Sequence, residues 1–469
     1  MKSLAKTVVL LLCATSLLAQ WSNDPAQNLK VASGGINHQI CTDGNGGAYI
    51  AWETGAPPNR RLLRIQRLDR FGVKQFPEQG LPIRMGEFDQ ANLKLFEDGS
   101  GGAIVVFNEL LPVADTLLAI AYAQRIDSTG TRLWGDSAVV VSPSAAHQIP
   151  MAACGDGMGG ALIFWSEDRD GDGNEELYGT GIDAGGGHPL GENGLLIVEA
   201  RYVGAEVVST ATHAILSYND NAEVLVQKFD NKLTPLWQHP VNLGFFTPRK
   251  MAADRTGGVV MTSKTQSFFD QQPFFKLWAQ RIDSLGNIVW NDGVVLADSV
   301  KEPTSAPQIA STGQSYYFVW NENPADGGDT FAQLVNKLGT AIWERNVHVS
   351  KSNSIKAVTD AVISSSDDVI IVWHDNRNGQ SFDLYGQLLD KNQDRFWGDS
   401  DVAISIRDDL QLDAVAVSDG RGGAIIAWNE LGAGTGNGVF AQQVSRDGKL
   451  GDVIVSVREQ DAQLSPSSF

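Results

Sequence analysis

An acidic stretch at residues 166–179, SEDRDGDGNEELYG, has the residue types and spacing of a calcium-binding loop. Calcium in proteins is bound by carboxylate and amide oxygens that recur along a short loop. The candidate ligands are the side-chain oxygens of Asp168, Asp170, Asp172, Asn174 and Glu176. The pattern departs from an EF-hand because a glycine stands at the twelfth position, where an EF-hand has a bidentate glutamate. The stretch predicts a structural calcium ion that stiffens one loop, and an ordinary acidic surface turn is the alternative.

A related stretch at residues 374–386, HDNRNGQSFDLYG, separates what is general in this loop from what is specific. Glu176 corresponds there to Asp383, so the closing acid belongs to a repeated pattern and is no evidence for a metal ion. Asp170 corresponds to Asn378. The calcium prediction therefore depends on the aspartates that stand where the second stretch has asparagines.

Both stretches belong to an internal repeat. The four clearest copies begin with D-G-x-G-G-A and run into apolar residues that end in an aromatic residue, and four weaker copies keep only part of this pattern. A segment similar to A-Q-R-I-D follows, and in six units an aromatic residue lies ten positions after its glutamine. The mean period of about 54 residues is typical of propellers or solenoids. The copies occupy residues 43–53, 98–109, 156–167, 211–220, 254–264, 311–322, 365–375 and 419–430.

Each repeat unit predicts four short β-strands. The Asp-Gly and Gly-Gly pairs supply the positive φ angles of tight hairpins, and no long segment has helical periodicity. About 54 residues is too short for an immunoglobulin-type sandwich and too long for one coil of a β-helix. We therefore predict an all-β fold: an eight-bladed β-propeller of four-stranded antiparallel blades around a channel. Seven blades is the alternative, because the fourth unit is degenerate and the eighth incomplete.

The N-terminal segment is predicted to close this ring. Trp21 lies 26 residues before Gly47, the same interval that separates Phe76 from Gly102 in the next unit. Residues 20–33 thus have the form of a fourth strand without the three that should precede it, and we expect them to form the outer strand of the eighth blade. Within a single domain at 20–469, residues 34–446 hold the eight repeats and 447–469 a C-terminal strand and tail.

The repeat pattern D-G-x-G-G-A-x-I-A-W … Y-A-Q-R-x-D-x-x-G-x-x-L-W resembles repeats in secreted proteins of Bacteroidetes-like bacteria. These proteins are generally regarded as β-propellers of unassigned activity. The resemblance covers nearly all of residues 21–446. It implies the propeller fold and says almost nothing about function.

Charge and the N-terminal sequence limit the possible locations and partners. Residues 1–19 are typical of a secretory signal peptide: Lys2 and Lys6 precede a short apolar run, and Ala19 is a plausible cleavage point. Without the two lysines the net charge is about −21, so nucleic acid is an improbable partner. No segment is long and apolar enough to insert into a membrane. We expect an exported, monomeric protein in the periplasm, at the cell surface or secreted.

One connection per unit, between the second and third predicted strands, varies in length while the others are nearly constant. Because variable loops on a rigid scaffold often bind ligands, we expect the ligand, a protein or a glycan, on this face. An acid follows the second strand in seven units and could contact cations or hydroxylated ligands; the alternative is that these acids bind loop amides and arginines. The acids are Glu53, Glu109, Glu167, Asp220, Glu322, Asp375 and Glu430.

A phenylalanine cluster in the fifth unit is a second candidate for ligand contact on this face. Phe268, Phe269, Phe274 and Phe275 lie within residues 267–278. Exposed phenylalanines would suit a protein partner or stack on a sugar, whereas buried ones would pack on the next blade.

Motifs for catalysis are absent from the sequence: it contains no H-E-x-x-H, C-x-x-C or G-x-S-x-G. We therefore assign no catalytic residue, and calcium is the only cofactor we expect. The sequence favours a binding or scaffold module over an enzyme. A glycan hydrolase or lyase on the same fold is one alternative, and a structural component of the cell surface is another.

Overall fold

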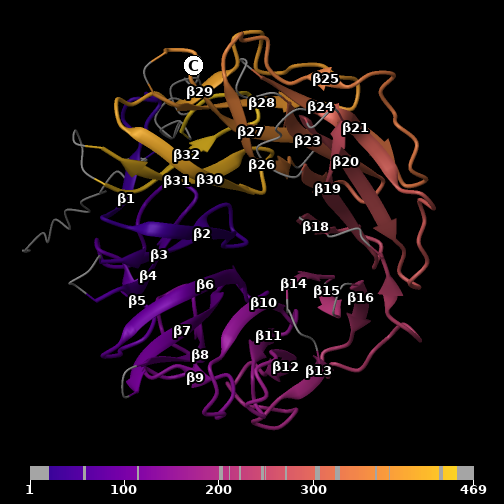
Figure 1. Cartoon of the computed structure of the whole chain (residues 1–469). Coiled ribbons are helices and arrows are strands. Elements are labelled where there is room, and N and C mark those ends of the chain that lie inside the picture. Colours follow the sequence, from indigo (N-terminus) through magenta and orange to yellow (C-terminus); the bar gives the residue numbers. More distant parts are fainter. Residues whose placement is uncertain are drawn as a thin grey trace, which may run out of the picture.

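The computed structural model describes residues 21–55, 60–113, 116–199, 204–210, 212–220, 223–244, 248, 250–269, 272–300, 307–322, 328–364, 367–379, 381–432 and 437–451. Eight four-stranded antiparallel sheets are arranged in a ring (Figure 1). The predicted eight-bladed propeller is confirmed, and seven blades is excluded. The predicted signal peptide and most of the predicted C-terminal strand and tail lie outside the described residues. None of the residues described forms a helix long and apolar enough to cross a membrane.

Each blade corresponds to one repeat unit. Blade 1 consists of β2 (Ile36–Thr42), β3 (Ala48–Thr54), β4 (Leu62–Leu68) and β5 (Leu81–Pro82); blade 2 of β6 (Asp89–Glu97), β7 (Ala103–Val113), β8 (Thr116–Ile126) and β9 (Val139–Val140). Blade 3 consists of β10 (Ile149–Gly155), β11 (Ala161–Glu167), β12 (Glu176–Ile182) and β13 (Leu195–Glu199); blade 4 of β14 (Ala205–Ser209), β15 (Ala214–Asp220), β16 (Glu223–Phe229) and β17 (Val241–Asn242). Blade 5 consists of β18 (Lys250–Ala253), β19 (Val259–Phe269), β20 (Gln272–Ile282) and β21 (Val294–Val300); blade 6 of β22 (Gln308–Ser311), β23 (Ser315–Glu322), β24 (Asp329–Asn336) and β25 (Val347–His348). Blade 7 consists of β26 (Lys356–Ile363), β27 (Val369–Asp375), β28 (Asp383–Leu389) and β29 (Val402–Ser405); blade 8 of β30 (Leu410–Ser418), β31 (Ala424–Leu431), β32 (Gly438–Val444) and β1 (Leu29–Ser33).

The order of strands defines two faces of the ring. The first strands of neighbouring blades contact one another, so they surround its centre. Because the strands are antiparallel, the turns that join first to second and third to fourth strands lie on one face. The connections from second to third strand lie on the opposite face, which we call the variable face. The loops of unequal length therefore do share one side of the molecule.

The N-terminal strand closes the ring as predicted. β1 pairs antiparallel with β32, with Leu29 opposite Ala441 and Ser33 opposite Gly438. The first and last parts of the described chain thus share one sheet, which joins blade 8 to blade 1 (Figure 1).

The Asp-Gly turns are held by their own aspartate. In blade 1, Asp43 Oδ1 accepts hydrogen bonds from the backbone nitrogens of Asn45 at 2.8 Å and Gly47 at 2.7 Å. Its Oδ2 binds Arg67, the arginine of the A-Q-R-I-D segment. A Cβ at Gly47 would lie 2.1 Å from the backbone oxygen of Leu68, so no larger residue fits there. The turn and the third strand of the blade are therefore fixed by the same residues that define the repeat.

The constant spacing between glutamine and aromatic residue also has a structural cause. Gln66 is fully buried, its Oε1 accepts from the backbone nitrogen of Phe76, and its Nε2 donates to the oxygen of Phe76. In the same way, Gln387 Oε1 accepts a hydrogen bond from the backbone nitrogen of Trp397. A chain of different length between the two residues would leave a buried amide without partners, which is costly.

A tryptophan next to the outer strand joins each of six blades to its successor. Its indole Nε1 donates to a backbone oxygen in the turn after the third strand of the next blade, over 2.8–3.2 Å. Trp21 makes this contact from blade 8 to blade 1, so the predicted equivalence of Trp21 with the other tryptophans is correct. The donor and acceptor pairs are Trp21 with Arg70, Trp134 with Ala184, Trp237 with Ser284, Trp290 with Lys337, Trp343 with Lys391 and Trp397 with Arg446.

Candidate functional site

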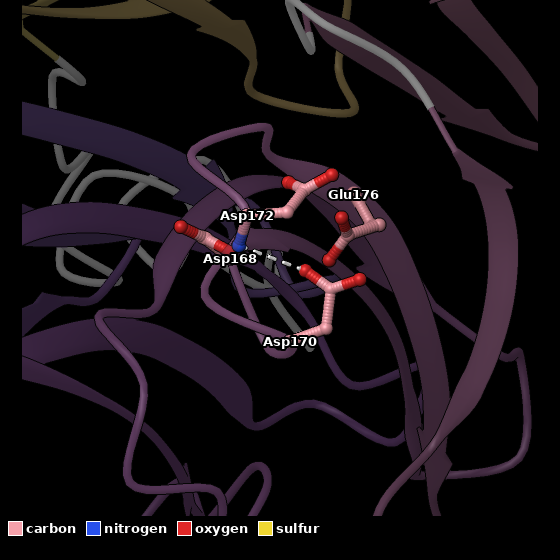
Figure 2. Close-up of side chains that lie close together, drawn as sticks. All are labelled: Asp168, Asp170, Asp172 and Glu176. Atoms are coloured by element: carbon pink, nitrogen blue, oxygen red, sulfur yellow. Dashed lines mark hydrogen bonds between the residues drawn. The ribbon is translucent and has the colours of Figure 1, made fainter.

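The acidic loop connects β11 to β12 on the variable face of blade 3. β11 ends at Glu167 and β12 begins at Glu176, and these two residues face each other across the hairpin. The loop between them brings four acids together, as Figure 2 shows. One carboxylate oxygen from each of Asp168, Asp170, Asp172 and Glu176 lies within 4.8 Å of the others. Two oxygens on opposite sides of a calcium ion, each at about 2.4 Å, would be about 4.8 Å apart. The spacing therefore fits one calcium ion.

Hydrogen bonds to the backbone orient three of these carboxylates. Asp168 accepts from the nitrogens of Gly171 at 2.8 Å and Gly173 at 3.0 Å. Asp170 Oδ1 accepts from Asp172 N at 3.1 Å, the dashed line in Figure 2. Asp172 accepts from both the backbone and the side-chain nitrogen of Asn174, each at 2.7 Å. The predicted ligand Asn174 thus positions Asp172 through its amide nitrogen.

The electrostatics of the loop favour a cation. Burial raises the pKa of Glu176, the repulsion of the three neighbouring aspartates raises it further, and a hydrogen bond from Arg169 N lowers it in part. The guanidinium of Arg169 binds Glu167 and stacks on the ring of Tyr178, with 3.7 Å from Cζ to the ring centroid. It is thereby directed to a carboxylate outside the cluster of four acids.

Blade 7 shows the same connection without the extra aspartates. Arg377 binds Asp375 at 2.6 Å and stacks on Tyr385 at 3.7 Å, which reproduces the arginine arrangement of blade 3. The Nδ2 of Asn378 donates to Asp383 at 2.7 Å. In blade 3, Asp170 replaces this asparagine. The hydrogen bond of blade 7 is therefore absent, and the carboxylates of Asp170 and Glu176 repel each other instead. A bound cation would remove that repulsion.

The acids that follow the second strand are mostly buried beneath arginines. Glu109, Glu167, Asp375 and Glu430 are buried, whereas Asp220 and Glu322 are half-buried. Each of Glu109, Glu167, Asp375 and Glu430 binds one arginine, and that arginine lies over an aromatic ring of the third strand. The pairs are Arg84 with Glu109, Arg169 with Glu167, Arg377 with Asp375 and Arg407 with Glu430; the rings belong to Tyr122, Tyr178, Tyr385 and Phe440.

These arginines explain how a carboxylate can remain charged while buried. Burial alone would raise the pKa of Asp375, but hydrogen bonds from Arg377, Ser354 and Trp373 hold it below the usual value. Arg84 and Arg407 were not predicted from the sequence as partners of these acids. Each comes from the connection that enters its blade, and the shared motif Ile-Arg at 83–84 and 406–407 was the available signal.

The assignment of Glu53 to this set is wrong. Glu167, Glu322 and Asp375 each follow a tryptophan by two positions and face the same side of the strand as that tryptophan. Glu53 follows Trp52 by one position, so it faces the other side, where Asn37 donates to it at 3.1 Å. Thr54 occupies the position of the acid in blade 1, opposite Leu62 on β4.

Two long hairpins extend the variable face. In blade 2, β7 and β8 are eleven residues each, and near their turn Val113 is 49% exposed and Leu117 59% exposed. In blade 5, β19 and β20 are equally long and contain the phenylalanine cluster. Phe274 and Phe275 are half-buried, and the ammonium of Lys264 lies 5.0 Å from the ring centroid of Phe275. The side chains of Phe268 and Phe269 lie outside the described part of the structure.

No protein-family profile and no curated protein sequence matches this chain. Solved structures resemble it at low identity. The NanB sialidase from Streptococcus pneumoniae is 10% identical with a TM-score of 0.35, over 75% of this chain and 67% of that one. A eukaryotic initiation factor is 10% identical with a TM-score of 0.42, over 91% and 89%. A protein of unknown function from Dyadobacter fermentans is 8% identical with a TM-score of 0.38, over 89% and 97%. Similarities this weak carry no argument about activity.

Proposed function

We propose that this protein is an exported binding module that holds a protein ligand on its variable face. The observation that carries the proposal is the pair of eleven-residue hairpins in blades 2 and 5, which extend that face, with apolar side chains exposed near the turn of the first. Exposed apolar residues on a rigid scaffold suit a protein surface, and a glycan is the other ligand class to be tested. The acids that follow the second strands support binding over glycan hydrolysis, since four of them are bound to arginines.

The hairpin of blade 2 provides the test. The double variant Val113→Ser, Leu117→Ser should fold with a free energy of unfolding within about 0.5 kcal/mol of wild type, because both residues are exposed. It should no longer retain the protein partner in affinity purification from the native host, measured by quantitative mass spectrometry. Leu285→Ser is the matched control, because Leu285 is 77% exposed in the turn at the other end of β20. Equal recovery of the same partner by both variants, or a melting-temperature response only to glycans, would contradict a protein ligand on this face.

We further propose that the loop of blade 3 binds one calcium ion that stiffens it. Asp168, Asp170, Asp172 and Glu176 would supply carboxylate oxygens, and their mutual repulsion without a cation supports this assignment. The ion would be structural: it would hold one connection of the variable face in a single conformation.

Asp170→Asn tests the calcium proposal because it copies blade 7. Wild type should bind one calcium ion in isothermal titration calorimetry, with affinity falling as pH decreases, because protons compete for Glu176 once its pKa is raised. Asp170→Asn and Asp172→Ala should bind at least about tenfold more weakly. Asp399→Asn, which changes an acid that pairs with Lys351 elsewhere, should bind like wild type. Wild-type affinity in both loop variants would show that the four acids form only an acidic turn.

A further inference from the structure

A cavity of about 530 Å³ lies between blade 8 and blade 1, apart from the acidic loop and the long hairpins. The closing strand β1 contributes residues 30–33 to its wall, and β3 contributes Trp52 and Thr54. Arg64 on β4, together with Lys74 and Glu78 from the connection to β5, completes the charged part of the lining. The volume falls in the range of small-molecule sites, about 300–1,000 Å³.

One buried polar atom in this lining has no hydrogen-bond partner. Trp52 is 1% exposed, and its indole Nε1 contacts no acceptor among the described residues. In blades 3, 6 and 7 the corresponding tryptophan donates to the acid two positions later, at 2.9, 2.9 and 3.0 Å. Blade 1 has Thr54 at that position, and its hydroxyl donates to the backbone oxygen of Leu62. Blade 1 therefore retains the donor of the repeat but lacks the carboxylate that the donor binds elsewhere.

Blade 8 shows that the missing acid is what distinguishes blade 1. Trp428 Nε1 also has no partner, but there Glu430 is present and is bound by Arg407 at 2.8 Å. Trp428 is not among the residues that line the cavity. Only in blade 1, within the described residues, is a tryptophan of this set combined with a threonine in place of the acid and with a cavity.

The charge of the lining matches an anion. Lys30, Arg64 and Lys74 contribute three positive charges and Glu78 one negative charge, in a chain of net charge −19. Lys74 pairs with Glu78, and Arg64 Nη1 donates a hydrogen bond to the backbone oxygen of Gly80 at 2.9 Å. A local excess of positive charge in a protein this acidic concentrates anions at the cavity.

We infer that this cavity binds a small ligand through a carboxylate group. The carboxylate lies among the basic residues of the lining. With a local displacement of the side chains that cover the buried Trp52 Nε1, it accepts the hydrogen bond of that atom, in the place that Glu167, Glu322 or Asp375 fills in other blades. An acidic sugar and an acidic peptide side chain both carry this group. Because the ligand contacts β1 and blade 1 together, its binding stabilises the closure of the ring. This site is separate from the long hairpins of the variable face and does not depend on the proposed function.

The test compares three probes at equal ionic strength: D-glucuronate, N-acetyl-L-glutamate and uncharged D-glucose. At least one carboxylate should bind wild type in calorimetry and raise the melting temperature, whereas glucose should do neither. Binding of both acids would show that the site recognises only the carboxylate group. Binding of D-glucuronate alone would indicate an acidic sugar, and binding of N-acetyl-L-glutamate alone an acidic peptide side chain. Absence of binding by both carboxylates, or equal binding of glucose, would overturn the proposal.

Two variants separate this site from a general effect of anions. Trp52→Phe keeps the ring but removes Nε1 and should weaken binding about tenfold or more. Thr54→Glu supplies the carboxylate internally, as Glu167 and Glu322 do, and should abolish binding while the protein melts at or above the wild-type temperature. Trp428→Phe is the matched control and should bind like wild type. Undiminished binding in Thr54→Glu would overturn the proposal even if Trp52→Phe failed to fold.

Discussion

Trp21→Ala should lower the free energy of unfolding by about 3–5 kcal/mol, the range for removal of a large buried aromatic side chain. Trp21 is 5% exposed, and its Nε1 donates to the backbone oxygen of Arg70 at 3.1 Å. Its ring also packs on Gly72, where even a Cβ would come within 2.8 Å. These contacts attach blade 8 to blade 1, so their loss weakens the junction at which the two ends of the described chain close the ring.

The measurement is urea unfolding followed by circular dichroism, since the substitution removes a fluorophore. A broadened transition with a lower slope is expected in addition to the lower midpoint, because an opened ring unfolds less cooperatively. Leu133→Ala is the control: Leu133 is 40% exposed beside Trp134 and should change stability by less than about 0.5 kcal/mol. A wild-type midpoint for Trp21→Ala would show that the backbone pairing of β1 with β32 closes the ring without the tryptophan.

Acidification from pH 6.5 to pH 4 should remove about 3 kcal/mol of stability through His374 alone. His374, on β27, is 8% exposed, and the Nδ1 of its ring has no hydrogen-bond partner among the described residues. Burial lowers its pKa from 6.5 to about 4, and the charge of Asp413 opposes this effect only in part. The unfolded chain therefore binds a proton in this window while the folded protein does not. Each unit of difference between the two pKa values corresponds to about 1.4 kcal/mol of stability. This stability is fully present above the unfolded pKa of 6.5 and is lost as the pH falls toward the folded pKa of about 4.

The comparison with His374→Gln isolates this contribution from the other groups that titrate. Free energies of unfolding are measured for both proteins at pH 7 and at pH 4. Glutamine cannot be protonated, so the advantage of wild type over the variant should shrink by about 3 kcal/mol between the two pH values. A constant difference across this range would show that His374 keeps an ordinary pKa in the folded protein.

Features of the fold could be predicted from the sequence where one unit of the repeat contains all the residues involved. The spacing of ten between Gln66 and Phe76 reflects hydrogen bonds within one blade, so the same spacing recurs wherever the aromatic residue is present. The spacing of Trp21 from Gly47 predicted the closing strand for a related reason. The partner of Trp21 is a turn of the repeat, and the same contact recurs between other blades.

Contacts between side chains from different connections could not be predicted from the sequence. Glu53 was grouped with the ring of acids because it follows the second strand, but the direction of a strand side chain changes with every residue. Arg84 and Arg407 enter their sites from the preceding connection, which the repeat pattern does not align. The cavity between blades 8 and 1 forms only when β1 packs beside β3, so no local pattern indicates it.

The amino-acid sequence by itself predicted eight blades, with seven as the alternative that the structure excludes, together with the course of each blade and the segment that closes the ring. It could do so because turn aspartates, close-packed glycines and buried glutamines act over short distances and are repeated about every 54 residues. Only the tertiary structure decided which carboxylates are neutralised by arginines, which four lie close enough to share a cation, and where a tryptophan lacks its acid. These properties depend on distances of a few ångströms between side chains that different connections and blades bring together.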